Sequence, residues 1–367
     1  MTSTESLGAA THEPERIVNT ADEAWRAVAS WPPVRGAGFS SVWVAVAVPA
    51  WRLESNLTER LKRSGFSPMH EHPWLLLAQA SGSPRPLLLS LSALLPLMGE
   101  ARIAVVSSDI EPSSAELLAE LEDPRRALER LTAHWVFPVV RERRLECHFQ
   151  PIFDRRGDLV GEEALARARV DGGLISAPLL LSAARALDIL PMVDRVLRDE
   201  AAARFKATAP PDAFLFLNFT ADNVGDPAAF ARAAGELADE VALDRAHMVF
   251  EATRAELSDH EDVATTLGAL RDAGFGIALD GLGTGDLGPS LVRAIRPTFA
   301  KIDGRTVRAS TTIPFAASLI RRLVTACAET QTRLVATGVE TTEQLGVLSH
   351  ANVDCFQGYL LAAPRKL

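Results

Sequence analysis

The chain has 367 residues, of which 47% are hydrophobic and 23% charged, and its formal net charge is −9. This length is enough for two or three ordinary domains, and the hydrophobic content is enough for a large core. The negative charge argues against a general nucleic-acid-binding protein, which needs a basic face. The three widely spaced cysteines, Cys147, Cys327 and Cys355, predict neither a disulfide framework nor a zinc site, but buried thiols in a reducing cytoplasm.

We expect no secretory signal in the N-terminal residues. Residues 1–15 are small, polar and acidic, and they lack the basic start and apolar core of a secretory signal. We therefore expect a disordered tail there. The longest apolar stretch, residues 86–98, is interrupted by Ser90, Ser92 and Pro96, so we expect no membrane span and a cytoplasmic protein.

All six tryptophans lie within the first 135 residues, and this step in composition predicts two domains. We expect a small α/β domain over residues 16–138. Its strands are expected over residues 41–48, 74–80 and 102–107, and its helices over residues 52–64 and 112–134. His70 and His72 flank Glu71, but Pro73 follows at once, so we interpret this segment as a turn with solvated imidazoles rather than as a metal site.

From residue 145 to residue 367 the pattern alternates between strands and helices. Strands are expected over residues 147–153, 158–168, 214–218, 247–251, 276–280, 299–302, 334–337 and 354–357. Helices are expected over residues 177–188, 192–205, 227–241, 260–273, 315–330 and 343–350. About eight strands with this alternation predict a closed parallel TIM-like (β/α)8 barrel. The alternative is a doubly wound sheet, although no Gly-rich dinucleotide loop follows the first strand.

Several of these apolar strands end in a polar residue. The residues at the strand ends are Glu163, Asn218, Glu251, Asp280 and Lys301. Polar groups at the carboxyl ends of barrel strands are the layout of a TIM-barrel active site. Three carboxylates and one amide oxygen suit Mg²⁺, Mn²⁺ or Ca²⁺, whereas Lys301 and Arg167 are available to neutralise the carboxylates or to bind a phosphate.

Further motifs are spread over residues 145–366. They are Phe149-Gln-Pro-Ile152, Glu163-Ala-Leu-Ala-Arg167, Gly172-Gly-Leu-Ile-Ser176, Leu217-Asn218, Glu251-Ala-Thr253, Leu279-Asp280, Gly283-Thr-Gly285, Lys301-Ile-Asp303, Gly338-Val-Glu-Thr341 and Gln357-Gly-Tyr359. In order and spacing this set resembles the EAL domain. Members of that family are TIM-like barrels, and the active ones hydrolyse the bacterial second messenger cyclic di-GMP to linear pGpG.

The resemblance implies a role for individual positions. The positions that match ligands of the first metal, Mg²⁺ or Mn²⁺, are Glu163, Asn218, Glu251 and Asp280. The positions that match nucleotide contacts are Gln150, Arg167 (phosphate), Asp194 (guanine edge) and Gln357. Lys301 matches a lysine that contacts the attacking water and the phosphate region. Glu340 matches the second acid of the family's Ala-Glu-Gly-Val-Glu stretch, and its alternative role is to cap the helix that follows.

Three positions depart from the pattern of active members. Gly281 and Thr337 stand where those members carry carboxylates linked to the second metal, and Arg254 stands in place of a glutamate. Together the departures shift the local charge by four units toward positive. Because two-metal hydrolysis needs negative ligands, we expect turnover near background and a vestigial Lys301. Arg254 is expected either to contact a phosphate or to pair with Glu251 or Asp280.

Three functions stay open from the sequence. The first is a degenerate EAL protein that acts as a cyclic di-GMP receptor or regulatory adaptor, signalling through its first domain or a protein partner. The second is a weak metal-dependent phosphodiesterase, and the third is an interaction module that binds neither nucleotide nor metal. The first domain is expected to be either a reduced GGDEF-type domain or a sensory domain. The apolar helix face over residues 315–323 would support a homodimer, and Tyr359 is expected to pack.

Overall fold

The computed structural model describes residues 16–18, 41–49, 55–81, 85–133, 135–171, 173–220, 224–253, 262–283 and 288–367. Arg254 and the expected N-terminal tail lie outside these ranges. The chain divides into two compact units, and each is described by itself. One unit comprises Met1–Arg144 with Ala168–Ile189, and the other comprises Leu145–Arg167 with Leu190–Leu367.

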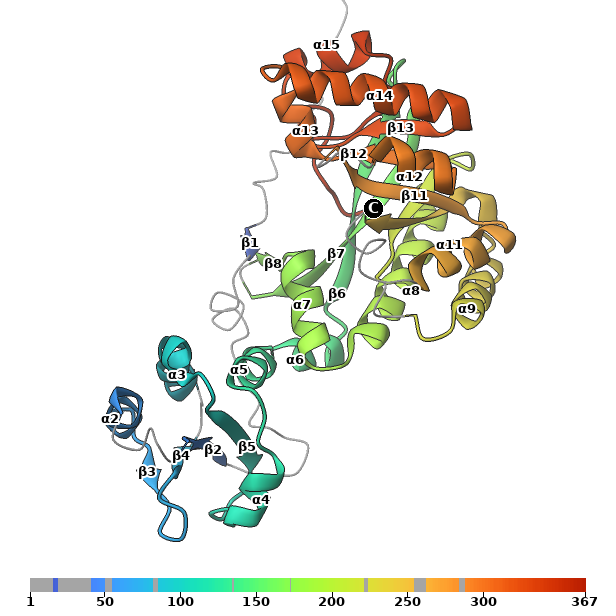
Figure 1. The fold of residues 1–367 in the computed structure, drawn as a ribbon. Helices are drawn as coiled ribbons and strands as arrows, with labels where there is room; N and C mark the ends of the chain where they lie inside the picture. The colour runs from blue at the N-terminus through green and yellow to red at the C-terminus, as the bar shows by residue number, and fades with distance from the viewer. Residues whose placement is uncertain are drawn as a thin grey trace, which may run out of the picture. The chain divides into compact units, whose positions relative to one another are not determined.

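The first unit contains a four-stranded antiparallel sheet (Figure 1). Its strands are β2 (Ser41–Ala47), β3 (Ser67–Pro68), β4 (Leu75–Ser81) and β5 (Arg102–Ser107), in the order β3-β4-β2-β5. Helix α2 (Asn56–Arg63) follows β2, and α3 (Arg85–Met98) follows β4. This succession and strand order are those of the split βαβ fold.

Alternation along β2 separates two packing layers. Val42, Val44 and Val46 pack with residues of α2 and α3, whereas Ala45 and Ala47 belong to a second cluster on the other face. The latter cluster includes Leu117 of α4 (Ser114–Ala119). Side chains of successive strand residues point to opposite faces, so this strand contributes to a core on both sides of the sheet.

The helix expected over residues 112–134 is two helices, α4 and α5 (Pro124–Thr132). Ser113 and Glu116 form a capping box at the start of α4, and Asp123 accepts backbone hydrogen bonds at the start of α5. Because proline lacks an N–H and fixes φ, Pro124 starts a new helix. The unit also contains α6 (Val136–Arg141), α7 (Ala177–Ala186) and the parallel pair β1 (Ile17–Val18) and β8 (Gly173–Ile175).

The second unit is a closed eight-stranded barrel, as the sequence predicts. Its strands are β6 (Leu145–Asp154), β7 (Leu159–Val170), β9 (Phe214–Asn218), β10 (Met248–Thr253), β11 (Gly276–Leu282), β12 (Phe299–Ile302), β13 (Arg333–Ala336) and β14 (Cys355–Phe356). The pairing of β7 with β9 closes the ring. The expectation that all strands are parallel is wrong for β6, which runs antiparallel to β14. A tight turn at residues 155–157 joins β6 to β7, and so short a connection permits only an antiparallel pair.

Helices lie outside the strands in chain order (Figure 1). They are α8 (Leu190–Thr208), α9 (Pro227–Glu240), α11 (Asp262–Asp272), α12 (Gly288–Ile295), α13 (Gly304–Ala309), α14 (Pro314–Thr330) and α15 (Thr342–His350), with a 3₁₀ turn η3 (Arg245–His247) before β10. The sequence pattern did not predict α12 and α13, whose short lengths leave little room for a periodic signal. Among the described residues no helix is long and apolar enough to span a membrane.

One buried residue from each barrel strand contributes to a layer of side chains inside the barrel. The layer consists of Ile152, Val160, Phe216, Val249, Ala278, Phe299, Val335 and Cys355. Phe299 stacks edge-on against Phe216, with ring centroids 4.8 Å apart. The barrel interior is therefore filled by apolar side chains at this level, and the polar side chains of the mouth lie above it.

Candidate functional site

A ring of polar side chains lies at the barrel mouth, next to this packed layer. Side chains two residues apart on a strand share a face. The residues two positions beyond the layer on six strands are Asn218, Glu251, Asp280, Lys301, Thr337 and Gln357, and the residue two positions before it on the reversed strand β6 is Gln150. On β7, Glu163 lies three positions beyond Val160, and its contact with Lys301 at 2.7 Å places it beside the same groups. The strand ends therefore place these groups at one end of the barrel.

Lys301 lies at the centre of this ring. Its ammonium donates to Glu163 Oε2 at 2.7 Å and to both carboxylate oxygens of Glu251 at 2.8 Å. Gln357 Nε2 donates to Glu163 Oε2 at 2.7 Å, and Asn218 Nδ2 lies 3.3 Å from Glu163 Oε1. Lys301 and Glu251 are each 1% exposed. A buried network of this kind is stable only because its charges are paired and its polar atoms are hydrogen-bonded.

One ammonium neutralises only part of the three carboxylates. Burial raises the pKa of Glu251 to about 8; the charge of Lys301 opposes this shift, and the neighbouring Glu163 and Asp280 add to it. Burial also raises the pKa of Asp280. For Glu163, burial is outweighed by the Lys301 charge and by hydrogen bonds from Lys301, Gln357 and Asn218, so its pKa lies below the usual value. Glu163 is thus the carboxylate that keeps its charge most readily.

The raised pKa of Glu251 predicts that stability falls as pH rises. Between its ordinary pKa of 4.5 and the folded value of about 8, the folded protein holds a proton that the unfolded chain releases. The free energy of unfolding should therefore decrease by up to about 1.4 kcal/mol per pH unit in this window because of Glu251. Urea denaturation from pH 5 to pH 8 in EDTA measures the slope. Glu251→Gln should flatten it, whereas the exposed-site control Glu59→Gln should not; equal slopes in all three proteins would contradict the prediction.

A pocket of about 290 Å³ opens beside this network. It is lined by Gln150, Glu163, Leu165, Arg167, Asp280, Lys301, Thr337, Gly338, Glu340, Gln357, Gly358, Tyr359 and Pro364. Arg167 Nη1 donates to the carbonyl of Ala166, whereas its buried Nε has no hydrogen-bond partner. A guanidinium that lines a polar pocket is suited to an anionic group.

The remaining predicted residues differ in their placement. Asp194 does not line this pocket: it is 7% exposed and pairs with Arg198 at 3.2 Å. Glu340 lines the pocket and lies 3.6 Å from Arg308, while the cap of α15 is formed by Thr341. Tyr359, expected to pack, is 70% exposed at the pocket. Leu165, Gly338 and Gly358 also line the pocket; they lie within the quoted motifs, but the sequence assigns them no role, and Pro364 lies outside every quoted motif.

Gly281 and Thr337, two of the three positions that depart from the pattern of active EAL members, are described by the structure. Both lie at the barrel mouth. Gly281 has φ +72° at the end of β11, and its N–H donates to Asp280 Oδ1 at 2.7 Å. A Cβ atom at Gly281 would meet nothing within 4 Å. Thr337 Oγ1 donates to the carbonyl of Ile302 at 2.8 Å. Neither position supplies a carboxylate to the mouth.

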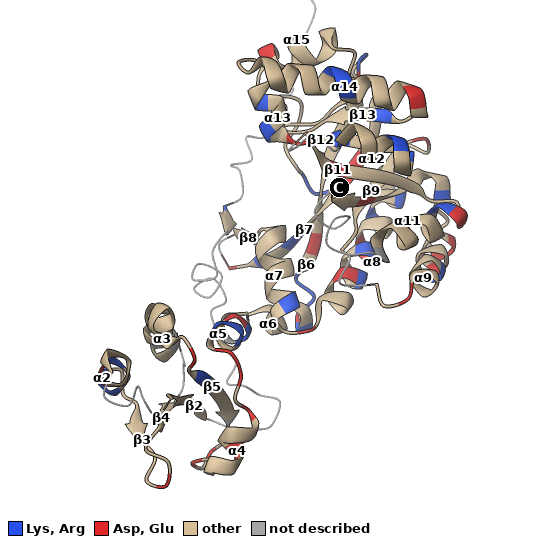
Figure 2. Ribbon diagram, viewed as in Figure 1, with Lys and Arg blue, Asp and Glu red and all other residues tan. Residues whose placement is uncertain are grey.

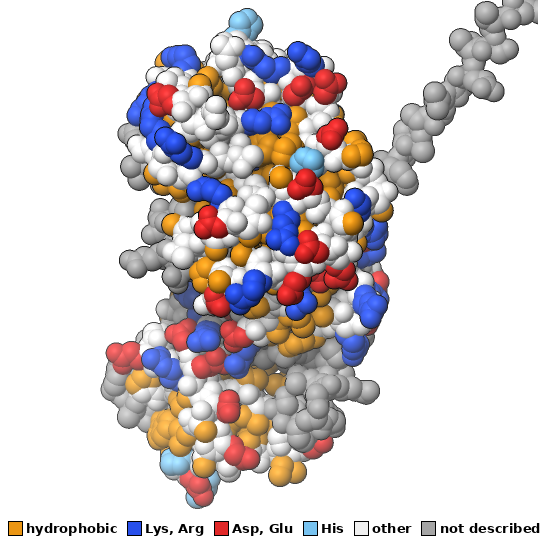
Figure 3. Space-filling view, turned by 90° about the vertical axis from the view of Figure 1, so that its right-hand side faces the viewer, with side chains coloured by type: hydrophobic (Ala, Val, Ile, Leu, Met, Phe, Trp, Pro, Cys, Tyr) orange, Lys and Arg blue, Asp and Glu red, His pale blue; other side chains and the backbone are white. Residues whose placement is uncertain are grey.

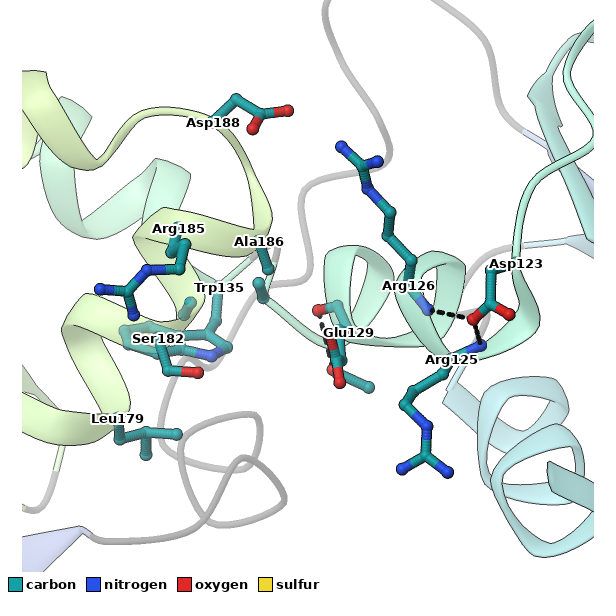
Figure 4. Close-up of a pocket in the computed structure, with 13 residues that line it drawn as sticks. Asp123, Arg125, Arg126, Glu129, Trp135, Leu179, Ser182, Arg185, Ala186 and Asp188 are labelled. Carbon is teal, nitrogen blue, oxygen red and sulfur yellow. Dashed lines mark hydrogen bonds between the residues drawn. The ribbon is translucent and has the colours of Figure 1, made fainter. Parts of the chain in front are cut away.

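A second, larger recess of about 620 Å³ lies in the first unit, between α5 and α7 (Figure 4). Its charged lining residues balance, with Arg125, Arg126 and Arg185 against Asp123, Glu129 and Asp188. The Asp123 carboxylate already accepts two backbone hydrogen bonds of α5. This recess lacks a buried charged network, so the barrel mouth is the stronger candidate site.

Charged residues outside the barrel mouth are distributed differently in the described part of the chain. Figure 2 shows acidic positions on the barrel strands, whereas many other charged residues lie on helices. On the face drawn in Figure 3, acidic and basic side chains are intermixed. This face therefore offers an anionic ligand no broad basic surface, whereas the pocket offers it specific groups.

The donor set at the mouth has the chemistry that a divalent cation prefers, but its arrangement does not fit one. The Lys301 ammonium contacts both Glu163 and Glu251, and Asn218 turns its amide nitrogen toward Glu163. Within the described ranges no group of three or more His, Cys, Asp or Glu side chains is placed to hold a metal ion. An ion at this point would have to displace the ammonium.

A closed barrel with a buried acid–lysine network at the carboxyl ends of its strands defines a TIM-like barrel protein with a candidate site at its mouth. The model of the EAL domain family matches residues 130–364, more than half of the chain, and the chain belongs to this family. The resemblance drawn from the motifs is thereby confirmed.

Several relatives of the chain have names that refer to cyclic di-GMP. Over 222 residues the chain is 29% identical to PdeG of Escherichia coli, a probable cyclic di-GMP phosphodiesterase, and the match covers 59% of this chain and 44% of PdeG. It is 30% identical over 222 residues to a cyclic di-GMP phosphodiesterase of Pseudomonas aeruginosa, covering 59% and 38% of the two chains. The chain thus spans less than half the length of these relatives.

Solved structures share the fold. YkuI of Bacillus subtilis, an EAL-domain protein in complex with cyclic di-GMP and calcium, is 21% identical with a TM-score of 0.56, covering 63% of this chain and 57% of that one. The FimX EAL domain of Pseudomonas aeruginosa, bound to cyclic di-GMP, is 20% identical with a TM-score of 0.57, covering 63% and 94%. At these identities the likeness shows the fold alone.

Proposed function

We propose that this protein is a cyclic di-GMP receptor of the EAL family whose capacity for hydrolysis is impaired. The observation that carries the proposal is the composition of the mouth. Gly281 and Thr337 supply no carboxylate, and the Lys301 ammonium contacts the carboxylates of Glu163 and Glu251. Hydrolysis that depends on carboxylate-bound cations is disfavoured by both features.

Binding needs a different set of groups, and these remain in the pocket. A cyclic dinucleotide carries two phosphates and two purine bases. Arg167 offers a charged guanidinium, whereas Gln150 and Gln357 offer amide groups. Glu340 is paired with Arg308, which limits its repulsion of a phosphate. Asp194 would reach a guanine edge only after leaving Arg198.

The alternative function, a weak metal-dependent phosphodiesterase, is favoured by one observation. Glu163, Asn218, Glu251 and Asp280 retain, on neighbouring strands, the oxygen donors that would hold one cation once it had displaced the Lys301 ammonium. This function predicts pGpG formation that stops in EDTA and in Glu163→Ala.

Calorimetric titration of the full chain with cyclic di-GMP, with and without Mg²⁺, tests the receptor proposal. We expect binding in both buffers, without pGpG formation. Arg167→Gln should weaken the affinity by about ten- to a hundredfold, because a charge-assisted hydrogen bond is lost. Arg293→Gln, which removes the exposed pair with Glu329, is the matched control and should bind normally. The absence of heat at tens of micromolar ligand in both buffers would overturn the proposal.

A further inference from the structure

Residues 358–366 run from the end of β14 back along β6 and contribute a wall of the candidate pocket. Gly358, Tyr359 and Pro364 line the pocket. A Cβ atom at Gly358 would lie 2.1 Å from the carbonyl oxygen of Val339, so the segment starts at a close backbone approach that only glycine allows. The segment is therefore held against the barrel at its first residue.

The end of the segment completes the edge of β6. Strand β14 consists of two residues and pairs with Phe153 and Asp154 of β6. Farther along β6, the backbone of Arg365 pairs with Phe149, with hydrogen bonds of 2.6 and 2.9 Å. Strand edges with unpaired backbone groups are normally covered, and Arg365 covers this part of the edge.

Two ion pairs reinforce this position. Arg365 Nη2 lies 2.6 Å from Glu162 Oε1, and Lys366 Nζ lies 2.9 Å from Glu146 Oε2. Glu162 is 2% exposed and Glu146 is 5% exposed, so both pairs anchor the segment to carboxylates inside the protein. Such carboxylates tolerate burial because they are paired.

The same segment fixes a residue of the pocket. Gln150 Nε2 donates to the carbonyl of Ala362 at 3.1 Å, and Gln150 follows Phe149, the backbone partner of Arg365. Glu162 precedes Glu163, the carboxylate that contacts Lys301. One ion pair thus joins the wall of the pocket to the strands that carry Gln150 and Glu163.

We infer that residues 362–366 form a strap, and that Arg365 and Glu162 are positioning residues that hold Gln150 and Pro364 in the geometry required by the ligand. This inference rests on the proposed function of the pocket, because the ligand in question is cyclic di-GMP. None of the family motifs identified in the sequence includes Arg365, and Glu162 directly precedes the motif that begins at Glu163.

The test separates a positioning role from a merely stabilising one. Arg365→Met leaves Glu162 buried without its partner, so we expect a lower unfolding temperature. Adding Glu162→Gln removes the buried charge and should restore most of that temperature without restoring the tether. In the double variant we expect faster hydrogen exchange over residues 145–153 and an affinity for cyclic di-GMP that is about three- to tenfold weaker. Arg245→Met, which removes the pair with Asp239 away from the pocket, is the matched control.

The outcomes are distinct. If the affinity of the double variant returns to the wild-type value together with its unfolding temperature, the strap has no positioning role and the inference is overturned. Wild-type hydrogen exchange over residues 145–153 in the double variant would overturn it as well. If the wild type binds no cyclic di-GMP, the proposed function fails, and the role of the strap in binding that ligand fails with it.

Discussion

Replacing Lys301 with methionine is expected to destabilise the barrel by about 3–5 kcal/mol at pH 7 in EDTA, because it leaves the buried Glu163 carboxylate without its cation and Glu251 without its hydrogen-bond donor. The ammonium makes hydrogen bonds of 2.7–2.8 Å to Glu163 and Glu251, and it is 1% exposed. Methionine is unbranched and only one heavy atom shorter than lysine, so the loss reports mainly on charge rather than on packing. Urea denaturation measures the effect.

Two further variants serve as a control and as a rescue for Lys301→Met. Lys62→Met removes an exposed ion pair with Glu59 by the same substitution and should cost less than about 1 kcal/mol. The double variant Lys301→Met with Glu163→Gln should recover part of the loss, because the unpaired buried charge is removed. A cost for Lys301→Met as small as that of Lys62→Met would show that the ammonium does not neutralise the mouth.

Restoring the missing carboxylates is the second substitution series with a large expected effect. The triple variant Gly281→Asp, Thr337→Glu and Arg254→Glu should gain pGpG formation in Mg²⁺ or Mn²⁺ by about 100-fold or more over the wild type. At Gly281 there is space for a side chain, and aspartate is among the residues that best tolerate a φ of +72°. At Thr337 the substitution gives up one hydrogen bond to Ile302. Product formation is followed by chromatography.

The matched control carries Asn, Gln and Gln at the same three positions and should stay inactive, since it has similar shapes without the negative charges. A triple carboxylate variant that binds cyclic di-GMP but gains no turnover would place the cause of impaired hydrolysis elsewhere, for example in the Lys301 network. Equal gains in the charged and neutral variants would exclude the electrostatic explanation.

The strands of the barrel were predictable because buried strands have a simple signal. Apolar runs such as residues 214–217 and 276–279 end in a polar residue, and the structure has strands at both. The direction of β6 was not predictable from its apolar pattern, which is the same for both directions. Helix α3 was also missed, because its continuous apolar sequence lacks the polar face that identifies a surface helix.

The sequence by itself determined the family, the barrel and the polar residues of its mouth, because strand periodicity and the motifs are local properties. Only the tertiary structure decided how those residues pair. It brought Lys301 between Glu163 and Glu251, and it placed Asp194 against Arg198 outside the pocket. It also joined Arg365 to Glu162 across 203 positions of the chain. Such contacts depend on the closure of the barrel and on the return of the chain along β6, which no local pattern encodes.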